Sequence, residues 1–333
     1  MKTVTIRDVA TLAGVSVGTA SRVMSHHPAT SEHSRTLVLQ AAAELGYHAN
    51  ARARSLRSSH AGTIGVLVPD IRNPFFADIA QAIEQRALAD GLATIICNAN
   101  ESVVQQDRYI DLLVDQRVDG VILAPQGDGS GELKVIQDWG VPLVFVDRRI
   151  DGTMVPSVTS DNVSGLAKAV HLLADLGHRR IGYVAGPSHT STGRERLAAF
   201  QQAARSVGVS PDAVFLGDFR YESGVAAGEY FLGLADPPTA IIAADSLMTL
   251  GVAFVCRQRG VAIPDELSLI GYDDVTAFRL IDPPLTVILH DPNLMGGLAY
   301  DMLADIIAGR TVRSQVIPST LVERASHGPA PSR

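Results

Sequence analysis

Apolar and polar positions divide this chain into two parts with different patterns. In residues 5–45, apolar residues recur every three or four positions, which predicts three short helices. From Thr63 onward, short apolar runs of the buried-strand type alternate with segments of helical periodicity. Such alternation predicts parallel sheets with right-handed crossovers. The alternating series occurs twice, so we expect an α/β body of two doubly wound lobes, with a ligand cleft at the carboxyl ends of the strands.

The expected elements of the body follow from these runs. In the first series the strands are TIGVLVP, ATIICN, VDGVILA and PLVFVD, and the helices lie near 74–90, 102–116 and 131–139. In the second series the strands lie near 180–184, 213–217, 239–243 and 267–271, and the helices near 161–176, 194–207, 221–234 and 246–259. Residues 286–324 should hold a strand, a helix over 291–308 and two short strands that cross back between the lobes.

Residues 5–24 have the spacing of two short helices joined by a tight turn. Gly14 stands where the chain must turn sharply, and only glycine takes a positive φ there without strain. Ser16 is placed to cap the second helix, whose buried stripe is Ala20 and Val23. This pattern is typical of a helix-turn-helix with its recognition helix starting near Ser16. Helical corners of this kind also occur in proteins without a DNA role.

The exposed face of the expected recognition helix carries Val17, Gly18, Ser21 and Arg22. A methyl-bearing side chain, a hydroxyl and a guanidinium suit base edges and phosphates. The same letters also spell the G-x-S-x-G pattern of hydrolases. That motif needs a strand before the serine, and the preceding residues here have helical periodicity, so we discard it.

A third helix is expected from about Ser31 to Leu45, ended by Gly46. Residues 50–58, NARARSLRS, form a separate basic unit in which Leu56 is the one large apolar residue. Two interpretations stay open for this unit. It is either a flexible linker or a hinge helix that orders on DNA, with Leu56 as a wedge between base steps of the minor groove.

Length and charge fit this division. The chain has 333 residues, enough for two or three domains, and no apolar run reaches the ~18 residues of a membrane span. Residues 1–60 carry seven Lys or Arg and three acids, a net +4, whereas the whole chain carries −7, which leaves −11 on the remainder. A basic head on an acidic body predicts a polyanionic partner for the head alone. The N-terminus lacks an apolar signal region, and Cys97 and Cys256 read as buried free thiols, so we expect a cytoplasmic protein.

Enzyme and metal chemistry find little support in the sequence. No G-x-G-x-x-G follows a strand, no P-loop is present, and no Ser/His/Asp order is supported. His26, His27 and His33 have no Cys or carboxylate at ligand spacing. We therefore expect no enzyme activity, no metal and no cofactor. A two-lobed solute-binding protein is the other alternative, but it would need a signal peptide and would have no basic head.

With head, hinge and two-lobed body in this order, the chain resembles the lactose-repressor (LacI/GalR) family of bacterial transcription regulators over roughly 5–326. The motifs that carry the resemblance are TIRDVATLAGVSVGTASRVM, LGYHANARARSLRS, TIGVLVPDIRNPFFADIAQAIE, RVDGVILAP, GRERLAAF, IPDELSLIGYDDV, PPLT and LVERAS. The resemblance implies a head over 1–48, a hinge over 49–60 and an effector body over 61–326. Lobe 1 would be 61–160 plus 292–320, lobe 2 would be 162–290, and 327–333 would be a disordered tail without a coiled-coil pattern.

The resemblance also implies which residues contact DNA. Val17, Gly18 and Arg22 match positions that read bases, and Gly18 removes a side chain that is often bulkier and polar in the family. The full implied set is Thr5, Ser16, Val17, Gly18, Thr19, Ser21, Arg22, Ser31, Asn50, Ala53 and Leu56. Thr5, Thr19, Ser21 and Ser31 match positions that tend to contact phosphate, and Leu56 is the intercalating wedge.

Nine positions match effector contacts in the family's cleft: Phe75, Phe76, Asp147, Arg148, Thr192, Arg196, Phe219, Asp245 and Asp273. Arg196 is the side chain most strongly expected to bind the effector, because an Arg suits bidentate recognition of hydroxyls or carboxylates. Aromatic rings beside carboxylates suit a sugar or a related metabolite. Two alternatives stay open: Phe75 and Phe76 as core residues at a helix start, and Asp161 as a helix cap rather than a hydroxyl acceptor. Many family members have an Asn where Ala244 stands, so one amide contact is lost here.

The function that the resemblance implies is sequence-specific transcription regulation under effector control. Repression is expected rather than activation, because occupancy of an operator is enough to block a polymerase. A homodimer formed through the body would place two heads on a pseudo-palindromic site, and the effector would change the spacing of the hinges.

Overall fold

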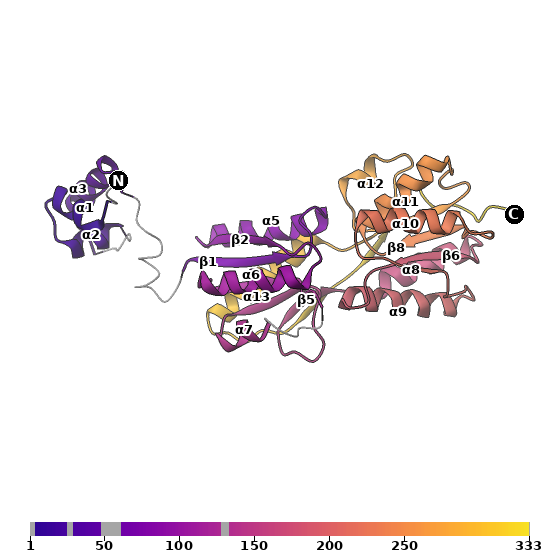
Figure 1. Cartoon of the computed structure of the whole chain (residues 1–333), viewed down its shortest axis with the longest axis horizontal. Helices are drawn as coiled ribbons and strands as arrows, with labels where there is room; N and C mark the ends of the chain where they lie inside the picture. Colours follow the sequence, from indigo (N-terminus) through magenta and orange to yellow (C-terminus); the bar gives the residue numbers. More distant parts are fainter. Residues whose placement is uncertain (1–3, 25–28, 48–60, 128–132, 333) are drawn as a thin grey trace. The chain divides into compact units, whose positions relative to one another are not determined.

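The computed structural model describes residues 4–24, 29–47, 61–127 and 133–332. The chain divides into two compact units, Met1–Ala61 and Gly62–Arg333 (Figure 1). The basic head expected from the sequence falls in the first unit and the α/β body in the second. The hinge residues Asn50, Ala53 and Leu56 lie outside the described residues.

The head consists of α1 (Ile6–Leu12), α2 (Val17–Met24) and α3 (Glu32–Glu44) in its described residues. Its core is built of small side chains: Val9, Ala10, Ala13, Ala20, Val23, Val38, Ala41 and Ala42. Gly14 takes a φ of 65° at the turn between the first two helices, which confirms the prediction for this position. A core of valine and alanine lets three short helices approach closely, but it buries little apolar surface.

The first lobe of the body is a six-stranded sheet in the order β11-β5-β4-β3-β1-β2, and every pair in it is parallel. Its strands are β1 (Thr63–Val68), β2 (Ala93–Asn98), β3 (Gly120–Leu123), β4 (Leu143–Asp147), β5 (Ser157–Ser160) and β11 (Gln315–Ile317). Its helices are α5 (Pro74–Ala89), α6 (Val103–Asp115), α7 (Leu133–Asp138) and α13 (Pro292–Ile307). Separate apolar clusters involve α5 with α13 and α6 with α7, as expected for a parallel sheet covered on both faces.

The second lobe is a six-stranded sheet in the order β12-β10-β9-β8-β6-β7. Its strands are β6 (Ile181–Ala185), β7 (Val214–Leu216), β8 (Ala240–Ala243), β9 (Ser268–Tyr272), β10 (Thr286–Leu289) and β12 (Thr320–Val322). Its helices are α8 (Ser164–Asp175), α9 (Ser191–Ser206), α10 (Tyr221–Leu232), α11 (Ser246–Arg259) and α12 (Thr276–Leu280). The sheet is parallel apart from β12, which runs antiparallel to β10. The doubly wound architecture is thereby confirmed for both lobes.

The chain crosses between the lobes three times, after β5, after β10 and between β11 and β12. Residues 286–324 therefore return from lobe 2 to lobe 1 and back, as the sequence predicted. The last crossing leaves only a short connection between β11 and β12.

The expectation of a disordered tail after Ser326 is wrong for the residues described. The backbone N–H of Ala330 donates to the carbonyl of Leu176 at 2.9 Å, and the carbonyl of Gly328 lies 3.0 Å from Nε2 of the buried His178. The sequence of this tail is rich in Gly, Pro and Ser, which suggests disorder. Its order comes from backbone groups that meet partners distant in sequence.

Candidate functional site

The exposed face of α2 is the candidate DNA-reading surface. Val17 is 42% exposed, and Arg22 lies along the helix with its Nε donating to the carbonyl of Gly18 at 3.3 Å. A Cβ at position 18 would lie 3.8 Å from Nη2 of Arg22 and 3.7 Å from Oγ of Ser16. Both distances are ordinary van der Waals contacts, so a small side chain at position 18 would also fit beside the arginine.

Several polar residues of the predicted DNA set hold helix ends in the head. Oγ of Ser16 accepts from the backbone N–H of Thr19 at 3.1 Å, and Oγ of Ser31 accepts from that of Ser34 at 3.2 Å. The backbone N–H and hydroxyl of Thr5 both donate to the Asp8 carboxylate, at 2.7 and 2.6 Å. These are N-terminal caps of α1, α2 and α3, so each residue has a structural task of its own. Ser21 is half-buried on α2.

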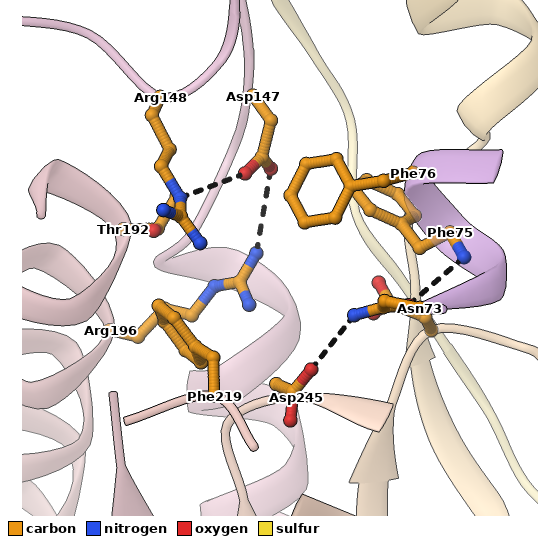
Figure 2. A pocket seen from close by; sticks show the side chains of 10 residues that line it. Asn73, Phe75, Phe76, Asp147, Arg148, Thr192, Arg196, Phe219 and Asp245 are labelled. Carbon is orange, nitrogen blue, oxygen red and sulfur yellow. Dashed lines mark hydrogen bonds and ion pairs between the residues drawn. The ribbon is translucent and has the colours of Figure 1, made fainter. Parts of the chain in front are cut away.

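The body contains a cavity of about 20 Å³ where the two lobes meet. It is lined by Asn73, Phe75, Phe76, Asp147, Arg148, Thr192, Arg196, Phe219, Asp245 and Asp273. The structure thus brings together all nine positions implied by the resemblance and adds Asn73. Figure 2 shows Asn73, Phe75 and Phe76 on the α5 side, facing Arg196, Phe219 and Asp245.

The parallel topology explains why these residues meet. Asn73 follows β1 and caps α5, with Oδ1 accepting from the backbone N–H of Phe75 at 3.0 Å. Asp147 is the last residue of β4, Asp245 follows β8, and Asp273 follows β9. The carboxyl ends of parallel strands lie at one edge of each sheet, and the two edges face each other across the cavity.

Three cavity residues occupy an unfavourable backbone region. Asp147, Phe219 and Asp273 have φ values of 60°, 63° and 61°, in the left-handed region that favours glycine. At Asp147 the turn is tight, since the backbone N–H of Arg148 donates to the carbonyl of Val146 at 2.6 Å. Such strain, of order 1 kcal/mol or more per residue, persists where the surrounding structure fixes the backbone, and it clusters at functional sites. The amino-acid pattern contains no signal of this strain.

Arg148 is held mainly by a residue outside the predicted set. Its Nη1 and Nη2 each donate to Glu101 at 2.8 Å, and Nη1 also donates to Oε1 of Gln126 at 2.8 Å. Its Cζ lies 5.7 Å from the ring centroid of Phe76 and 5.1 Å from that of Phe219. The guanidinium of Arg148 therefore lies between an aromatic ring of lobe 1 and one of lobe 2, and Glu101 balances its charge.

Arg196 is fixed by lobe 2. Its Nε donates to Oδ1 of Asn162 at 2.8 Å, and Nη1 donates to the carbonyl of Ala244 at 2.7 Å. Its Cζ lies 4.3 Å from the ring centroid of Tyr272, a cation–π contact. The remaining nitrogen, Nη2, lies 4.0 Å from Oδ1 of Asp147 (Figure 2). Ala244 thus contacts Arg196 through its backbone carbonyl, because alanine has no side-chain amide.

The carboxyl groups of the cavity are buried and difficult to ionise. Burial raises the pKa of Asp245 to about 7 and that of Asp273 to about 8. Burial also raises the pKa of Asp147, against the opposing effect of Arg196 and Arg148. Among the described residues that line the cavity, four atoms are buried without a hydrogen-bond partner: Oδ1 of Asp147, Oδ1 of Asp273, Oγ1 of Thr192 and Nε of Arg148. Orphaned buried polar atoms are uncommon in proteins, and several of them lining one cavity are consistent with a ligand that completes their hydrogen bonds.

A direct bond crosses the cavity from lobe to lobe. Nδ2 of Asn73 donates to Oδ2 of Asp245 at 2.9 Å (Figure 2). The hydroxyl of Ser246 donates to Oδ1 of Asn73 at 3.0 Å. On the same lobe boundary, Arg220 donates to the carbonyl of Asn100 at 2.9 Å. These bonds hold the lobes closed over the cavity.

The alternatives left open by the sequence are now decided in part. Asp161 accepts from the backbone N–H groups of Val163 and Ser164 at 2.9 and 3.0 Å and does not line the cavity, so it is a cap at the start of α8. Phe75 and Phe76 are both cavity-lining and part of the lobe 1 core. Sequence reasoning missed Asn73, although an Asn before a Pro at a strand-to-helix turn is a typical N-cap signal.

No helix in the described parts of the chain is long and apolar enough to cross a membrane. The described residues also contain no group of three His, Cys, Asp or Glu that could hold a metal ion.

Head and body together define a class: a helix-turn-helix unit joined to a two-lobed binding domain. Residues 5–50 match the model of bacterial regulatory proteins of the lacI family, and residues 170–327 match a periplasmic binding protein-like domain. The chain is 32% identical to the HTH-type transcriptional repressor PurR of Edwardsiella ictaluri (strain 93-146), over 98% of each chain. It is 33% identical to the HTH-type transcriptional repressor CytR of Escherichia coli (strain K12), over 93% of this chain and 92% of that one.

Comparison with solved structures identifies the same class of protein. The lac repressor dimer bound to operator and the anti-inducer ONPF superposes with a TM-score of 0.86 at 31% identity, over 98% of this chain and 99% of that one. A complex of the transcriptional regulator CelR with cellobiose has a TM-score of 0.74 at 32% identity, over 97% and 99%. The chain belongs to the LacI family of bacterial transcription regulators.

Proposed function

We propose that this chain is an operator-binding repressor whose affinity for double-stranded DNA is set by a sugar-like effector in the interlobe cavity. The cavity carries the proposal, because Asp147, Thr192 and Asp273 each present a buried oxygen without a partner in the described chain. Burying such groups unbonded costs about 1–3 kcal/mol each, and a bound ligand removes that cost. The lac repressor and CelR complexes, which contain ONPF and cellobiose, support a sugar-like ligand.

The head supports the operator half of the proposal. α2 presents Val17 and Arg22 on its solvent side, while Ala20 and Val23 are buried against the other helices. A helix of this size fits the major groove, and an Arg can donate two hydrogen bonds to a guanine edge. Thr5, Thr19, Ser21 and Ser31 would contact phosphates, and Asn50, Ala53 and Leu56 of the hinge would contact the minor groove.

The assembly would be a homodimer, which presents two heads to a pseudo-palindromic operator. Exposed apolar side chains on both lobes support this: Leu88 on α5 is 65% exposed, Ile96 on β2 47%, Phe254 on α11 43% and Leu280 on α12 79%. The lac repressor relative is a dimer on its operator. Because its target is operator DNA, we place the protein in the cytoplasm, as a regulator and not an enzyme.

Thr192 offers a clean test of the cavity. Its hydroxyl has no partner among the described residues, so Thr192→Val removes a ligand contact and breaks no bond within the protein. A thermal-shift panel of sugars, sugar phosphates and nucleobases first identifies a ligand, because specific binding raises the apparent stability. Operator affinity is then titrated with that ligand for each variant.

We expect Thr192→Val to weaken the response to the ligand by about 5- to 10-fold, the value of one hydrogen bond, while operator affinity without ligand stays unchanged. The matched control is Thr94→Val on β2, which removes another buried, unpartnered hydroxyl away from the cavity. Equal responses of Thr192→Val, Thr94→Val and the wild type would contradict the proposed site.

A further inference from the structure

Two ion pairs join the lobes beside the cavity. Nη2 of Arg149 lies 2.8 Å from Oε1 of Glu195. Nη2 of Arg194 lies 2.8 Å from Oδ2 of Asp151. Arg149 and Asp151 follow β4 in lobe 1, whereas their partners lie on α9 in lobe 2. A contact of 3.1 Å between Arg149 and Asp151 connects the two pairs into one chain of alternating charges. The backbone N–H of Arg149 also crosses the boundary and donates to Oγ of Ser191 at 3.0 Å.

These four charged residues border the wall of the cavity. On lobe 1, the two residues before Arg149 line the cavity. On α9 the lining residues Thr192 and Arg196 stand one helical turn apart, and Arg194 between them is exposed. The ion pairs therefore lie on the outer side of the wall whose inner side would face a ligand.

Glu195 connects the ion pairs to Arg196. Its Oε2 accepts from Nδ2 of Asn162 at 2.8 Å, and Oδ1 of the same amide accepts from Nε of Arg196 at 2.8 Å. Asn162 thus holds a residue of the cavity wall and a residue of the ion pairs at the same time. The placement of the Arg196 guanidinium and the contact between the lobes depend on shared partners.

The cavity is too small in this closed arrangement to admit an effector. Its volume of about 20 Å³ holds about one water molecule. A ring-sized molecule can enter only when the lobes separate. Separation breaks both ion pairs between the lobes, because each joins atoms only 2.8 Å apart.

The strength of these pairs is limited by solvent. The four side chains are between 33% and 63% exposed, so water and salt screen their attraction. One exposed pair changes an equilibrium by about 1.4- to 5-fold. Two pairs acting together can therefore change the opening of the lobes by about 10-fold.

We infer that a salt-sensitive clamp sets how often the cavity opens, and that it consists of Arg149, Asp151, Arg194 and Glu195. The clamp contacts no effector, but it controls access to the cavity and makes that access depend on ionic strength. Its regulatory meaning rests on the proposed function. Its existence is tested with neither effector nor operator.

Alkylation of a thiol inside the cavity measures the opening on the full-length protein. Thr192 is 2% exposed, so Thr192→Cys reacts with iodoacetamide, a small neutral reagent, only when the lobes separate. Lobe motions are much faster than alkylation, so the rate is proportional to the equilibrium constant for opening. The native Cys97 and Cys256 are buried, and burial raises their pKa values to about 11 and about 12. The protein without the cavity thiol gives their background rate.

Neutralising either pair should accelerate alkylation by about 3-fold, and Arg149→Gln with Arg194→Gln by about 10-fold. Asp151→Asn and Glu195→Gln should accelerate it as well. Loss of a nearby cation raises the pKa of the cavity thiol, whereas loss of a nearby anion lowers it. Acceleration by variants of both signs therefore reports opening and not a change in the reactivity of the thiol.

Salt provides a second measurement. Raising NaCl from about 0.05 M to about 0.5 M should accelerate alkylation of the cavity-thiol protein by about 5-fold and should leave the double arginine variant nearly unchanged. Arg310→Gln is the control, because the exposed pair of Arg310 with Asp305 lies within lobe 1, and its rate should match that of the parent.

Three results would overturn the clamp: rates equal to the parent in all four single variants, acceleration by variants of one charge sign only, or a cavity thiol that reacts as fast as in the unfolded chain. Operator binding is measured separately on the same proteins. Absence of any preference for a double-stranded site overturns the proposed function, while the alkylation rates still decide the clamp.

Discussion

The head and the cavity use their polar side chains in opposite ways. On the head, Ser16 and Ser31 are exposed, and their hydroxyls already bond the ends of α2 and α3. In the cavity, Asp273 and Thr192 are buried, and they present oxygens without partners in the described chain. The head is therefore assembled without its DNA, whereas the cavity is left electrostatically incomplete without a ligand. A ligand shifts a conformational equilibrium only by the difference between its affinities for the two states, and unpartnered cavity groups offer contacts that can differ between those states.

The largest effect should come from separating the two copies. Leu280 is 79% exposed on α12, so Leu280→Lys leaves the fold intact and places a charge on the proposed dimer surface. A monomer loses the second half-site, and operator affinity should fall by about 100-fold or more. Sedimentation and DNA binding at equal concentrations measure this. The control is Met154→Lys, at a 97% exposed apolar residue outside the proposed surface, and equal losses in both variants would contradict the dimer.

The next effect tests the head as a reader of bases. Arg22→Ala should weaken operator binding by about 5- to 150-fold, the value of one bidentate base contact, and relax the preference at one base pair. Binding to random duplex should change much less. Arg35→Ala removes a comparable charge from exposed α3, and we expect it to weaken operator and random DNA equally. Competition binding separates the two patterns.

A third effect tests whether the empty cavity costs stability. The folded-state pKa of Asp273 is raised to about 8, so its favourable contribution is complete below about pH 4 and is lost as pH rises through 8. Asp245, at about 7, acts in the same window. Relative to the wild type, Asp273→Asn should therefore gain unfolding free energy between pH 5 and 8, by at least about 1.4 kcal/mol. Thermal unfolding without ligand measures the difference, and a constant difference across this range would contradict the account.

The smallest effect compares a hydroxyl of the head that caps a helix with a hydroxyl of the cavity that has no partner. Ser31→Ala removes the cap of α3 and should destabilise the head by about 1 kcal/mol. Thr192→Val in the cavity should raise the stability of the ligand-free protein by about 1–3 kcal/mol, because it removes a buried hydroxyl that has no partner. Hydrogen exchange in each unit reports both values. A larger loss for Thr192→Val than for Ser31→Ala would reverse the comparison.

Much of the fold could be predicted, because local signals sufficed. Gly14, Ser31 and the alternation of strands and helices are read from neighbouring residues. The positions of Asp147 and Asp273 at strand ends follow from the parallel topology. The pairings inside the cavity could not be predicted, since the bond between Glu101 and Arg148 joins two different strand ends. Asp161 shows the same limit, because a carboxylate before a helix fits both a cap and a ligand contact.

For the C-terminal tail, the composition predicted disorder where the structure shows order. Residues after Ser326 have a composition typical of disorder, yet Gly328 and Ala330 bond to backbone and side-chain groups near the start of β6. Composition reports the average tendency of a segment, whereas its order depends on partners elsewhere in the chain. The cavity residues could be predicted only through the family resemblance. The contacts of Asn73 and Gln126 became visible only in the structure.

The central claim is that the cavity and the operator are energetically coupled, and one set of titrations tests it. The affinity of the effector is measured with free protein and with operator-bound protein, and operator affinity is measured with and without effector. Linkage requires the same factor in both comparisons, and we expect it to lie between about 5- and 150-fold. A ligand that saturates the cavity while both factors equal one would contradict the account.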